Sequence, residues 1–230
     1  MSIDNVVKLI DAITQLLNVL IWPGVIVFFL VRFGQDLRQF FSSLGELTFK
    51  GAGFEASLKK KQAQATAALA AAAAARTDVD KTPEGAVQEA KIAADIVADA
   101  VTPKVIRQAS KATVLWVDDR PNNNVYERQS LEALGINFVL ATSTDEALEK
   151  LHRRHFDVII SDMGRPPDAR AGYTLLDQLR KQGNKTPFII YAGSRAPEHI
   201  AESRQHGAMG CTNMPNELFE MVLFTLGRAS

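Results

Sequence analysis

From residue 112 onwards, short apolar runs alternate with amphipathic stretches, and this alternation constrains the fold more than any other feature of the sequence. Each amphipathic stretch has the spacing of a helix with one apolar face. Five such repeats predict an α/β domain in which helices cover both faces of a five-stranded parallel sheet. The expected strands are residues 114–117, 137–141, 158–161, 188–192 and 210–212. The expected helices are residues 125–134, 144–152, 173–181, 197–205 and 216–227.

Acidic residues follow two of the expected strands directly. Asp118 and Asp119 come after the first strand, and Asp162 comes after the third. Sites in open parallel sheets lie outside the carboxyl ends of the strands, so these side chains are expected to converge. Three converging carboxylates repel one another unless a hard cation such as Mg²⁺ lies between them. Beside such an ion, a carboxylate can act as a nucleophile towards phosphorus. Taken singly, each aspartate could instead be a helix cap or a solvated loop residue.

Four segments together resemble the receiver domain of two-component response regulators: VLWVDDRP at 114–121, VIISDMG at 158–164, KTPFII at 185–190 and GAMGCTNMP at 207–215. The resemblance covers about half the chain. It implies a flavodoxin-like fold with strand order 2-1-3-4-5 over residues 112–230. It also implies that Asp162 is the phosphoacceptor, and that Asp118, Asp119, Asp162 and the backbone carbonyl of Gly164 are the Mg²⁺ ligands. The implied partner is a histidine kinase or another signalling protein, and the implied role is signalling rather than enzymatic.

The sequence departs from the receiver pattern at both positions that normally respond to phosphate. The Ser/Thr expected after the fourth strand is Ala192, and the lysine expected before the last proline is Met214. Neither side chain can bond a phosphoryl group. Ser194 could substitute for the missing hydroxyl, and Arg165 could reach an anion beside Asp162, or it could be a solvated loop arginine.

The N-terminal part of the chain has the character of a membrane anchor. Residues 12–31 carry no charge, and as a helix they would reach about 30 Å, the thickness of a hydrocarbon core. Basic residues follow this run, which places the C-terminal side in the cytoplasm by the positive-inside rule. We therefore expect a single transmembrane helix at about residues 12–33 within an N-terminal segment 1–34, in a bacterial inner membrane. This helix could also support a homo-oligomer.

Three other interpretations of this run are less consistent with the sequence. A signal peptide would have its basic residues before the apolar run and a small-residue cleavage site after it. A buried helix of a globular domain is seldom uncharged over this length. A helix lying in the membrane interface remains an alternative, because Thr14, Gln15 and Asn18 make the first half less apolar.

Residues 35–111 are interpreted as a juxtamembrane helical spacer. An amphipathic stretch begins it, and an alanine-rich stretch at 57–76 follows. Alanine favours helix, but small side chains bury little surface, so this stretch is expected to be a solvated helix or a partly ordered tether. A further helix is expected over residues 87–101. No catalytic constellation is found before residue 112.

Composition gives no support for nucleic-acid binding and excludes a disulfide within the chain. The 26 basic and 26 acidic residues give a formal net charge of zero, so the chain has no overall charge that would attract nucleic acid. The single cysteine, Cys211, excludes an internal disulfide. Three hypotheses remain: a membrane-anchored receiver phosphorylated on Asp162, a receiver-shaped adaptor that recruits a partner without phosphotransfer, and an Mg²⁺-dependent phosphohydrolase. The third lacks an evident general acid or base.

Overall fold

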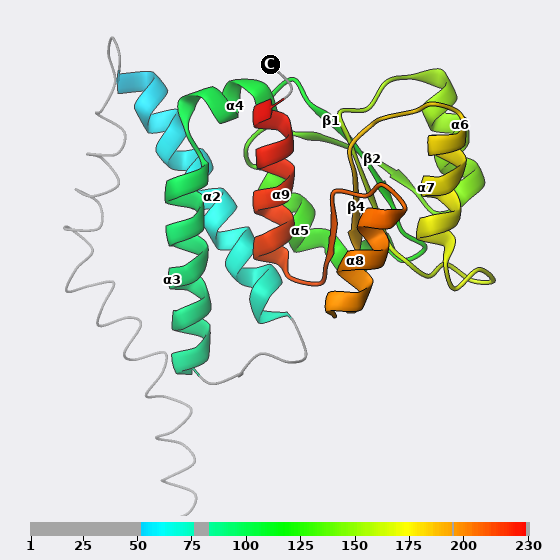
Figure 1. Ribbon diagram of the computed structural model, residues 1–230. Helices are drawn as coiled ribbons and strands as arrows, with labels where there is room; N and C mark the ends of the chain where they lie inside the picture. The colour runs from blue at the N-terminus through cyan, green and yellow to red at the C-terminus, as the bar shows by residue number, and fades with distance from the viewer. Residues whose placement is uncertain (1–51, 76–82, 195, 229–230) are drawn as a thin grey trace, which may run out of the picture. The chain divides into compact units, whose positions relative to one another are not determined.

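The computed structural model describes residues 52–75, 83–194 and 196–228 (Figure 1). The expected transmembrane helix at 12–33 lies outside the described residues. Among the helices that are described, none has the length and apolar character needed to cross a bilayer. Ser57–Ser230 forms one compact unit, and the fold below is that of this unit.

A five-stranded parallel sheet forms the centre of the unit, with strand order β2-β1-β3-β4-β5. This confirms the predicted sheet and its order. The strands alternate side chains between two cores: Val114 and Trp116 of β1 belong to one, and Leu115 and Val117 belong to the other. The strands are β1 Thr113–Val117, β2 Asn137–Ala141, β3 Val158–Ser161, β4 Phe188–Tyr191 and β5 Gly210–Thr212.

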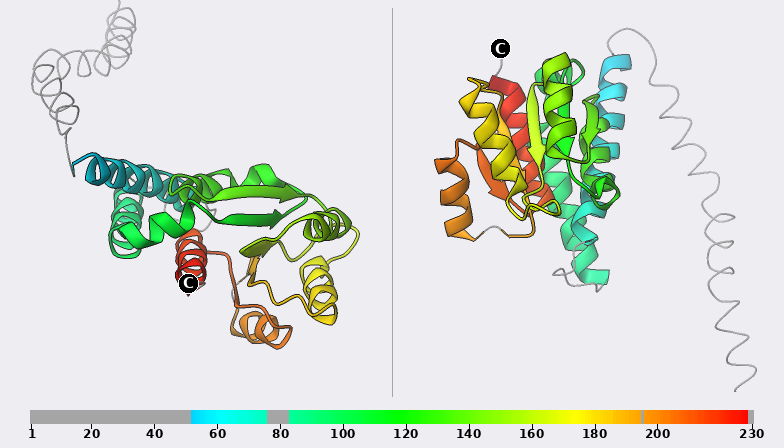
Figure 2. Two further views of the ribbon diagram at one scale, coloured as in Figure 1. Left: turned by 90° about the horizontal axis from the view of Figure 1, so that it is seen from above. Right: turned by 90° about the vertical axis from the view of Figure 1, so that its right-hand side faces the viewer.

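Five helices follow the strands and cover both faces of the sheet, as predicted (Figure 2). Core residues of α5 and α9 lie on one face, and those of α6 and α7 lie on the other, where Ile200 of α8 also packs. A short 3₁₀ turn at Pro121–Asn124 precedes the first of these helices. The helices are α5 Val125–Glu132, α6 Thr144–Arg153, α7 Ala171–Lys181, α8 Pro197–Gln205 and α9 Pro215–Arg228.

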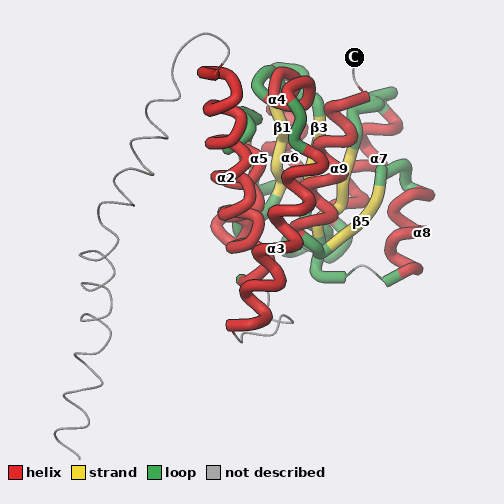
Figure 3. Tube along the Cα trace, turned by 90° about the vertical axis from the view of Figure 1, so that its left-hand side faces the viewer, coloured by secondary structure: helices red, strands yellow, loops and turns green. Residues whose placement is uncertain are grey.

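Three further helices precede the sheet: α2 Ala52–Ala74, α3 Pro83–Ala100 and α4 Pro103–Ala109. From Ser57 onwards they belong to the same unit as the sheet. Leu69 of α2 and Val97 of α3 are buried in one core with Phe219 and Val222 of α9. Figure 3 shows α2, α3 and α9 near one another. The expectation of a solvated tether is therefore wrong for the described part of this stretch. Its small alanine side chains let helices approach closely, and the compact unit begins at Ser57, well before the sheet.

Candidate functional site

The three predicted acidic residues meet at the carboxyl edge of the sheet. Val117 of β1 pairs with Ser161 of β3, so the residues that follow each strand lie side by side. Asp118, Asp119 and Asp162 each place a carboxylate oxygen within 4.8 Å of the other two. Asp118 is buried, and the other two are half-buried. The predicted convergence is confirmed.

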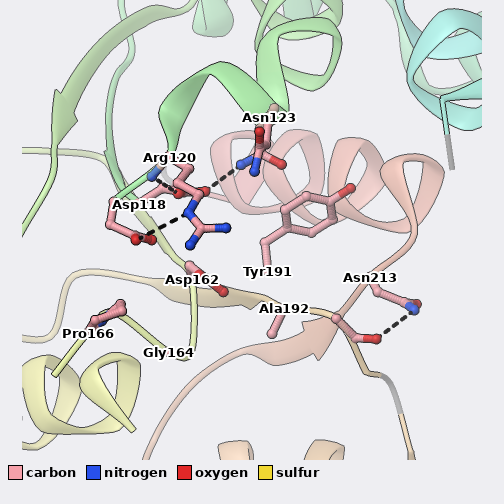
Figure 4. A pocket seen from close by; sticks show the side chains of 12 residues that line it. Asp118, Arg120, Asn123, Asp162, Gly164, Pro166, Tyr191, Ala192 and Asn213 are labelled. Carbon is pink, nitrogen blue, oxygen red and sulfur yellow. Dashed lines mark hydrogen bonds and ion pairs between the residues drawn. The ribbon is translucent and has the colours of Figure 1, made fainter. Parts of the chain in front are cut away.

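Backbone and side-chain donors fix the orientation of these carboxylates (Figure 4). The Arg120 backbone N–H donates to Oδ1 of Asp118 at 2.6 Å, and the Asn124 side-chain amide donates to Oδ2 at 2.5 Å. The Met163 backbone N–H donates to Oδ1 of Asp162 at 2.7 Å. Each of the two carboxylates retains lone pairs that can face a cation.

The electrostatics of the cluster favour a bound cation. Burial raises the pKa of Asp162, and the negative charges of Asp118 and Asp119 raise it further. A divalent ion between the three groups would offset this repulsion. Mg²⁺ holds its oxygen ligands at about 2 Å, so two ligands on opposite sides of it lie about 4 Å apart. The cluster needs only small side-chain adjustments to reach that spacing, so its donor set fits Mg²⁺.

A pocket of about 430 Å³ opens beside the cluster. It contains Gly164, the predicted backbone ligand, and Ala192, the position where a hydroxyl was expected. Arg120 is the cationic side chain among the described residues that line it. The lining residues are Asp118, Asp119, Arg120, Asn123, Asn124, Asp162, Gly164, Pro166, Tyr191, Ala192, Gly193 and Asn213.

Arg165 does not line this pocket. Its side chain is 4% exposed, so the alternative of a solvated loop arginine is wrong. One terminal nitrogen donates to Ser161 Oγ and to the Asp162 carbonyl, both at 2.7 Å. The other donates to Thr144 Oγ1 at 3.1 Å and to the Ala171 carbonyl at 3.0 Å. The guanidinium therefore ties the loop after β3 to the start of two helices, next to Asp162.

The remaining predicted positions also lie outside the acidic pocket. Ser194 lines a neighbouring hollow with Cys211, and its hydroxyl lies 3.0 Å from the Nδ1 of His199. Met214 follows Asn213, and its backbone N–H donates to the hydroxyl of Thr212 at 3.0 Å. Neither Ser194 nor Met214 is among the lining residues, whereas Asn213 is.

Sequence reasoning missed two features of this site. The first is Asn124, which precedes α5 and whose side-chain amide orients Asp118. The hydroxyl of Tyr191, a pocket residue, donates to Oε1 of Glu127 at 2.9 Å, which joins β4 to α5. The partners are 64 residues apart, so no local pattern could have indicated this hydrogen bond.

Comparison with known proteins agrees with this geometry. Residues 114–222 match the response regulator receiver domain family. The chain is 27% identical over 114 residues to the sensor histidine kinase RcsC of Escherichia coli, covering 50% of this chain and 12% of that protein. It is 31% identical over 90 residues to the sensor protein EvgS of Escherichia coli, covering 39% of this chain and 7% of that protein. The matched segments thus span about a tenth of these relatives.

Two solved structures are also similar to this chain. The receiver domain of the Francisella response regulator 1452 is 26% identical, with a TM-score of 0.46, over 51% of this chain and 97% of that one. The chemotaxis response regulator CheY4 of Vibrio cholerae is 28% identical, with a TM-score of 0.44, over 50% of this chain and 98% of that one.

The acidic cluster, the strand order and the family match together define the class. Residues 114–222 form a response regulator receiver domain, a module of two-component phosphorelay signalling. Such domains generally serve signalling rather than catalysis, bind Mg²⁺ at an acidic pocket and interact with histidine kinases and other signalling proteins.

Proposed function

We propose that this protein is a membrane-anchored receiver of the phosphorelay type, in which Asp162 accepts a phosphoryl group and the domain acts by protein contact. The observation that carries the proposal is the convergence of Asp118, Asp119 and Asp162 within 4.8 Å beside an open pocket. The proposed partner is a histidine kinase. The proposed anchor is a helix at about residues 12–33 of a bacterial inner membrane, with the receiver domain in the cytoplasm.

In this proposal, an oxygen of the Asp162 carboxylate attacks phosphorus, and the bond from phosphorus to the donor nitrogen breaks. The product is an acyl phosphate, and the donor imidazole, already protonated on its other nitrogen, leaves neutral as the electron pair of the broken bond passes to its ring. Asp118, Asp119, Asp162 and the Gly164 carbonyl would hold Mg²⁺, which when bound offsets negative charge on the phosphoryl group. Arg120 lines the same pocket, so it can supply positive charge that Met214 lacks.

A second function is favoured by one observation. Ala192 lines the pocket at the position where a Ser/Thr hydroxyl is expected to contact the phosphoryl group. Without that hydroxyl, the side chain at this position cannot bond the phosphoryl group and so cannot respond to phosphorylation. The alternative is an adaptor that recruits a signalling partner to the membrane without phosphotransfer.

Incubation of the full chain with acetyl phosphate and Mg²⁺ separates these functions. The phosphorelay proposal expects one added phosphoryl group by mass spectrometry, which hydroxylamine removes and which Asp162→Asn lacks. Asp145→Asn, at an exposed aspartate in the first turn of α6, is the matched control and should label normally. No labelling, together with no Mg²⁺ effect on Trp116 fluorescence in a Trp22→Phe chain, would favour the adaptor. Release of many phosphates per chain would instead indicate a phosphohydrolase.

The membrane anchor needs its own test. Membranes from expressing cells are washed with alkaline carbonate, which removes peripheral proteins and leaves spanning ones. The full chain is expected to stay in the pellet. A charge placed at the centre of the apolar run, Val25→Arg, is expected to release it. Release of the unaltered chain would contradict the anchor.

A further inference from the structure

The edge of the sheet opposite the acidic pocket carries a cluster of exposed basic side chains. We name it the basic edge and define it by Lys104, Arg107, Lys111, Arg153, Arg154 and Lys185. Lys111 lies just before β1, Arg153 and Arg154 lie shortly before β3, and Lys185 lies shortly before β4. Because the strands are parallel, their amino ends share one edge, and these residues gather there.

Few acidic groups offset this charge. Glu149 pairs with Arg153 one helical turn away. Asp157 is half-buried, and its Oδ2 accepts a hydrogen bond from the Thr113 backbone N–H at 2.7 Å. Asp99, at the end of α3, and Glu132, at the end of α5, are exposed carboxylates close to this edge. Within the described residues, Lys104, Arg107, Lys111 and Lys185 form no ion pair. The basic edge therefore keeps several uncompensated positive charges.

The helix dipole explains only part of this cluster. Basic residues in the last turn of a helix are favoured by its partial negative charge, which accounts for Arg153 in α6. Lys111 and Lys185 lie in connections beyond the ends of α4 and α7. The chain as a whole has zero formal net charge, so the excess at this edge reflects a separation of charge across the unit.

The chain enters the compact unit at this same edge. Lys61 of α2 donates to the Ala133 carbonyl at 3.3 Å, at the end of α5. A Cβ at Gly135, in the turn before β2, would lie 3.5 Å from the Lys61 ammonium and 3.2 Å from Ser110. Lys61 of α2, the end of α4 and the turn before β2 therefore meet here. Figure 1 shows α4 and the end of α9 at the same upper margin.

From these observations we propose that the basic edge binds the surface of an anionic membrane. Lys59 and Lys60 are exposed and precede Lys61, so they extend the positive charge towards the entering chain. Anionic lipid headgroups attract exposed lysines and arginines close to the bilayer, and the attraction weakens beyond a Debye length. This inference rests on the proposed anchor, which holds the unit near the bilayer.

Such docking fixes the direction of the acidic pocket. The pocket lies at the carboxyl ends of the strands and the basic edge at the amino ends, so the two face opposite ways. Strand β1 has five residues and spans about 17 Å. With the basic edge on the lipid, Asp118, Asp119 and Asp162 open towards the cytoplasm, where a soluble partner can reach them.

The test uses the full chain reconstituted into vesicles, with Cys211→Ser to remove the native thiol. A fluorophore is attached at Gln182→Cys, an exposed position at the basic edge, or at Glu198→Cys, an exposed position at the start of α8 on the opposite side. Vesicles contain a nitroxide-labelled headgroup, in phosphatidylcholine alone or with one third phosphatidylglycerol. We expect quenching at position 182 to rise several-fold with phosphatidylglycerol, to fall again in high salt, and to stay low at position 198.

Two charge variants make the test specific. Replacing Arg153, Arg154 and Lys185 with glutamine is expected to abolish the lipid-dependent quenching, since each charge contributes roughly a fivefold preference for an anionic surface. Arg153→Lys with Arg154→Lys keeps the charge and is expected to keep the quenching. Quenching that is equal at both positions, or unchanged by the glutamine variant, would overturn the proposal. A loss of quenching in the lysine variant would also overturn it, because that result indicates a bidentate arginine site and not a lipid surface.

Alkaline extraction of the same vesicles distinguishes this inference from the anchor. If the chain resists extraction but shows no lipid-dependent quenching, the anchor stands and the basic edge does not bind lipid. If the chain is extracted but quenches at position 182 only with phosphatidylglycerol, the anchor fails and the basic edge is supported.

Discussion

The hydroxyl of Tyr191 donates a 2.9 Å hydrogen bond to the carboxylate of Glu127, and this contact links the acidic pocket to helix α5. Tyr191 lines the pocket, and its ring packs edge-on against Trp116 at 5.9 Å between centroids. Glu127 is buried at the start of α5, whose other side chains share a core with α2 and α9. The hydrogen bond therefore gives a direct contact between a pocket residue and the helices that cover this face of the sheet.

Glu127→Gln is expected to stabilise the fold at neutral pH. Burial raises the pKa of Glu127 above its ordinary value of 4.5. In the unfolded chain the Glu127 carboxyl loses its proton at the ordinary pKa. At pH values between this pKa and the raised pKa of the folded state, the folded state therefore binds more protons than the unfolded chain. Stability therefore falls as pH rises through this window, and the loss persists above it. Glutamine removes the buried negative charge, and its side-chain carbonyl can still accept the hydrogen bond from the Tyr191 hydroxyl.

Urea unfolding at pH 4, 5.5 and 7.5 measures this effect. The stability gain of Glu127→Gln should be smallest at pH 4 and largest at pH 7.5. Glu132→Gln, at an exposed position of the same helix, is the control and should change stability little at any pH. A gain that is independent of pH would contradict the explanation.

Asp162→Asn is expected to weaken Mg²⁺ binding by at least 10- to 100-fold, because it removes a carboxylate ligand. The same substitution relieves repulsion with Asp118 and Asp119, so the metal-free fold should melt at a higher temperature. Burial and the neighbouring charges raise the pKa of Asp162, so protons compete with the cation, and Mg²⁺-dependent stabilisation should decline as pH falls. Thermal melting with and without Mg²⁺ over a pH series measures all three effects; an unaltered Mg²⁺ response in Asp162→Asn would exclude this residue as a ligand.

The sheet and its acidic site were predictable because their signals are local. A short parallel strand is buried on both faces, so β1 and β3 appear as continuous apolar runs, and the aspartates follow them directly. The packing of α2 was not predictable, because alanine-rich helices bury small side chains and show no stripe of large ones. The burial of Arg165 depends on acceptors from β3 and the starts of α6 and α7, which only the tertiary fold brings together.

Arg165→Met is expected to destabilise the fold by about 2–4 kcal/mol, because it removes the buried hydrogen bonds from the guanidinium to Ser161, Asp162 and Ala171. Arg204→Met, at an exposed arginine in the last turn of α8, is the matched control and should cost less than about 0.5 kcal/mol. Chemical unfolding of both variants measures the difference. Equal stability of the two would show that the buried guanidinium contributes nothing.

Gly172→Ala is expected to disturb the position of Asp162, the proposed phosphoacceptor. A Cβ there would lie 2.8 Å from the Asp162 carbonyl oxygen and 3.2 Å from Cδ1 of Ile190, so the backbone must shift. The expected cost is about 1–3 kcal/mol, with reduced labelling by acetyl phosphate. Gly227→Ala meets no atom within 4 Å and should be neutral or stabilise helix α9 by up to about 1 kcal/mol. Normal stability and labelling in Gly172→Ala would show that the loop adapts without moving Asp162.

Leu69→Ala tests whether α2 belongs to the receiver unit. Leu69 is fully buried with core residues of α3, α5 and α9, so the substitution should cost about 2–4 kcal/mol in a single cooperative transition. Val87→Ala is the control, since Val87 is 70% exposed on α3 and should change stability by less than about 0.5 kcal/mol. Unfolding is followed by the fluorescence of Trp116, which lies in the sheet and not in α2, in a Trp22→Phe background. If Leu69→Ala left the Trp116 transition unchanged, α2 would fold independently of the sheet. A transition at lower denaturant would show that α2 covers the face formed by α5 and α9 as part of the same cooperative unit.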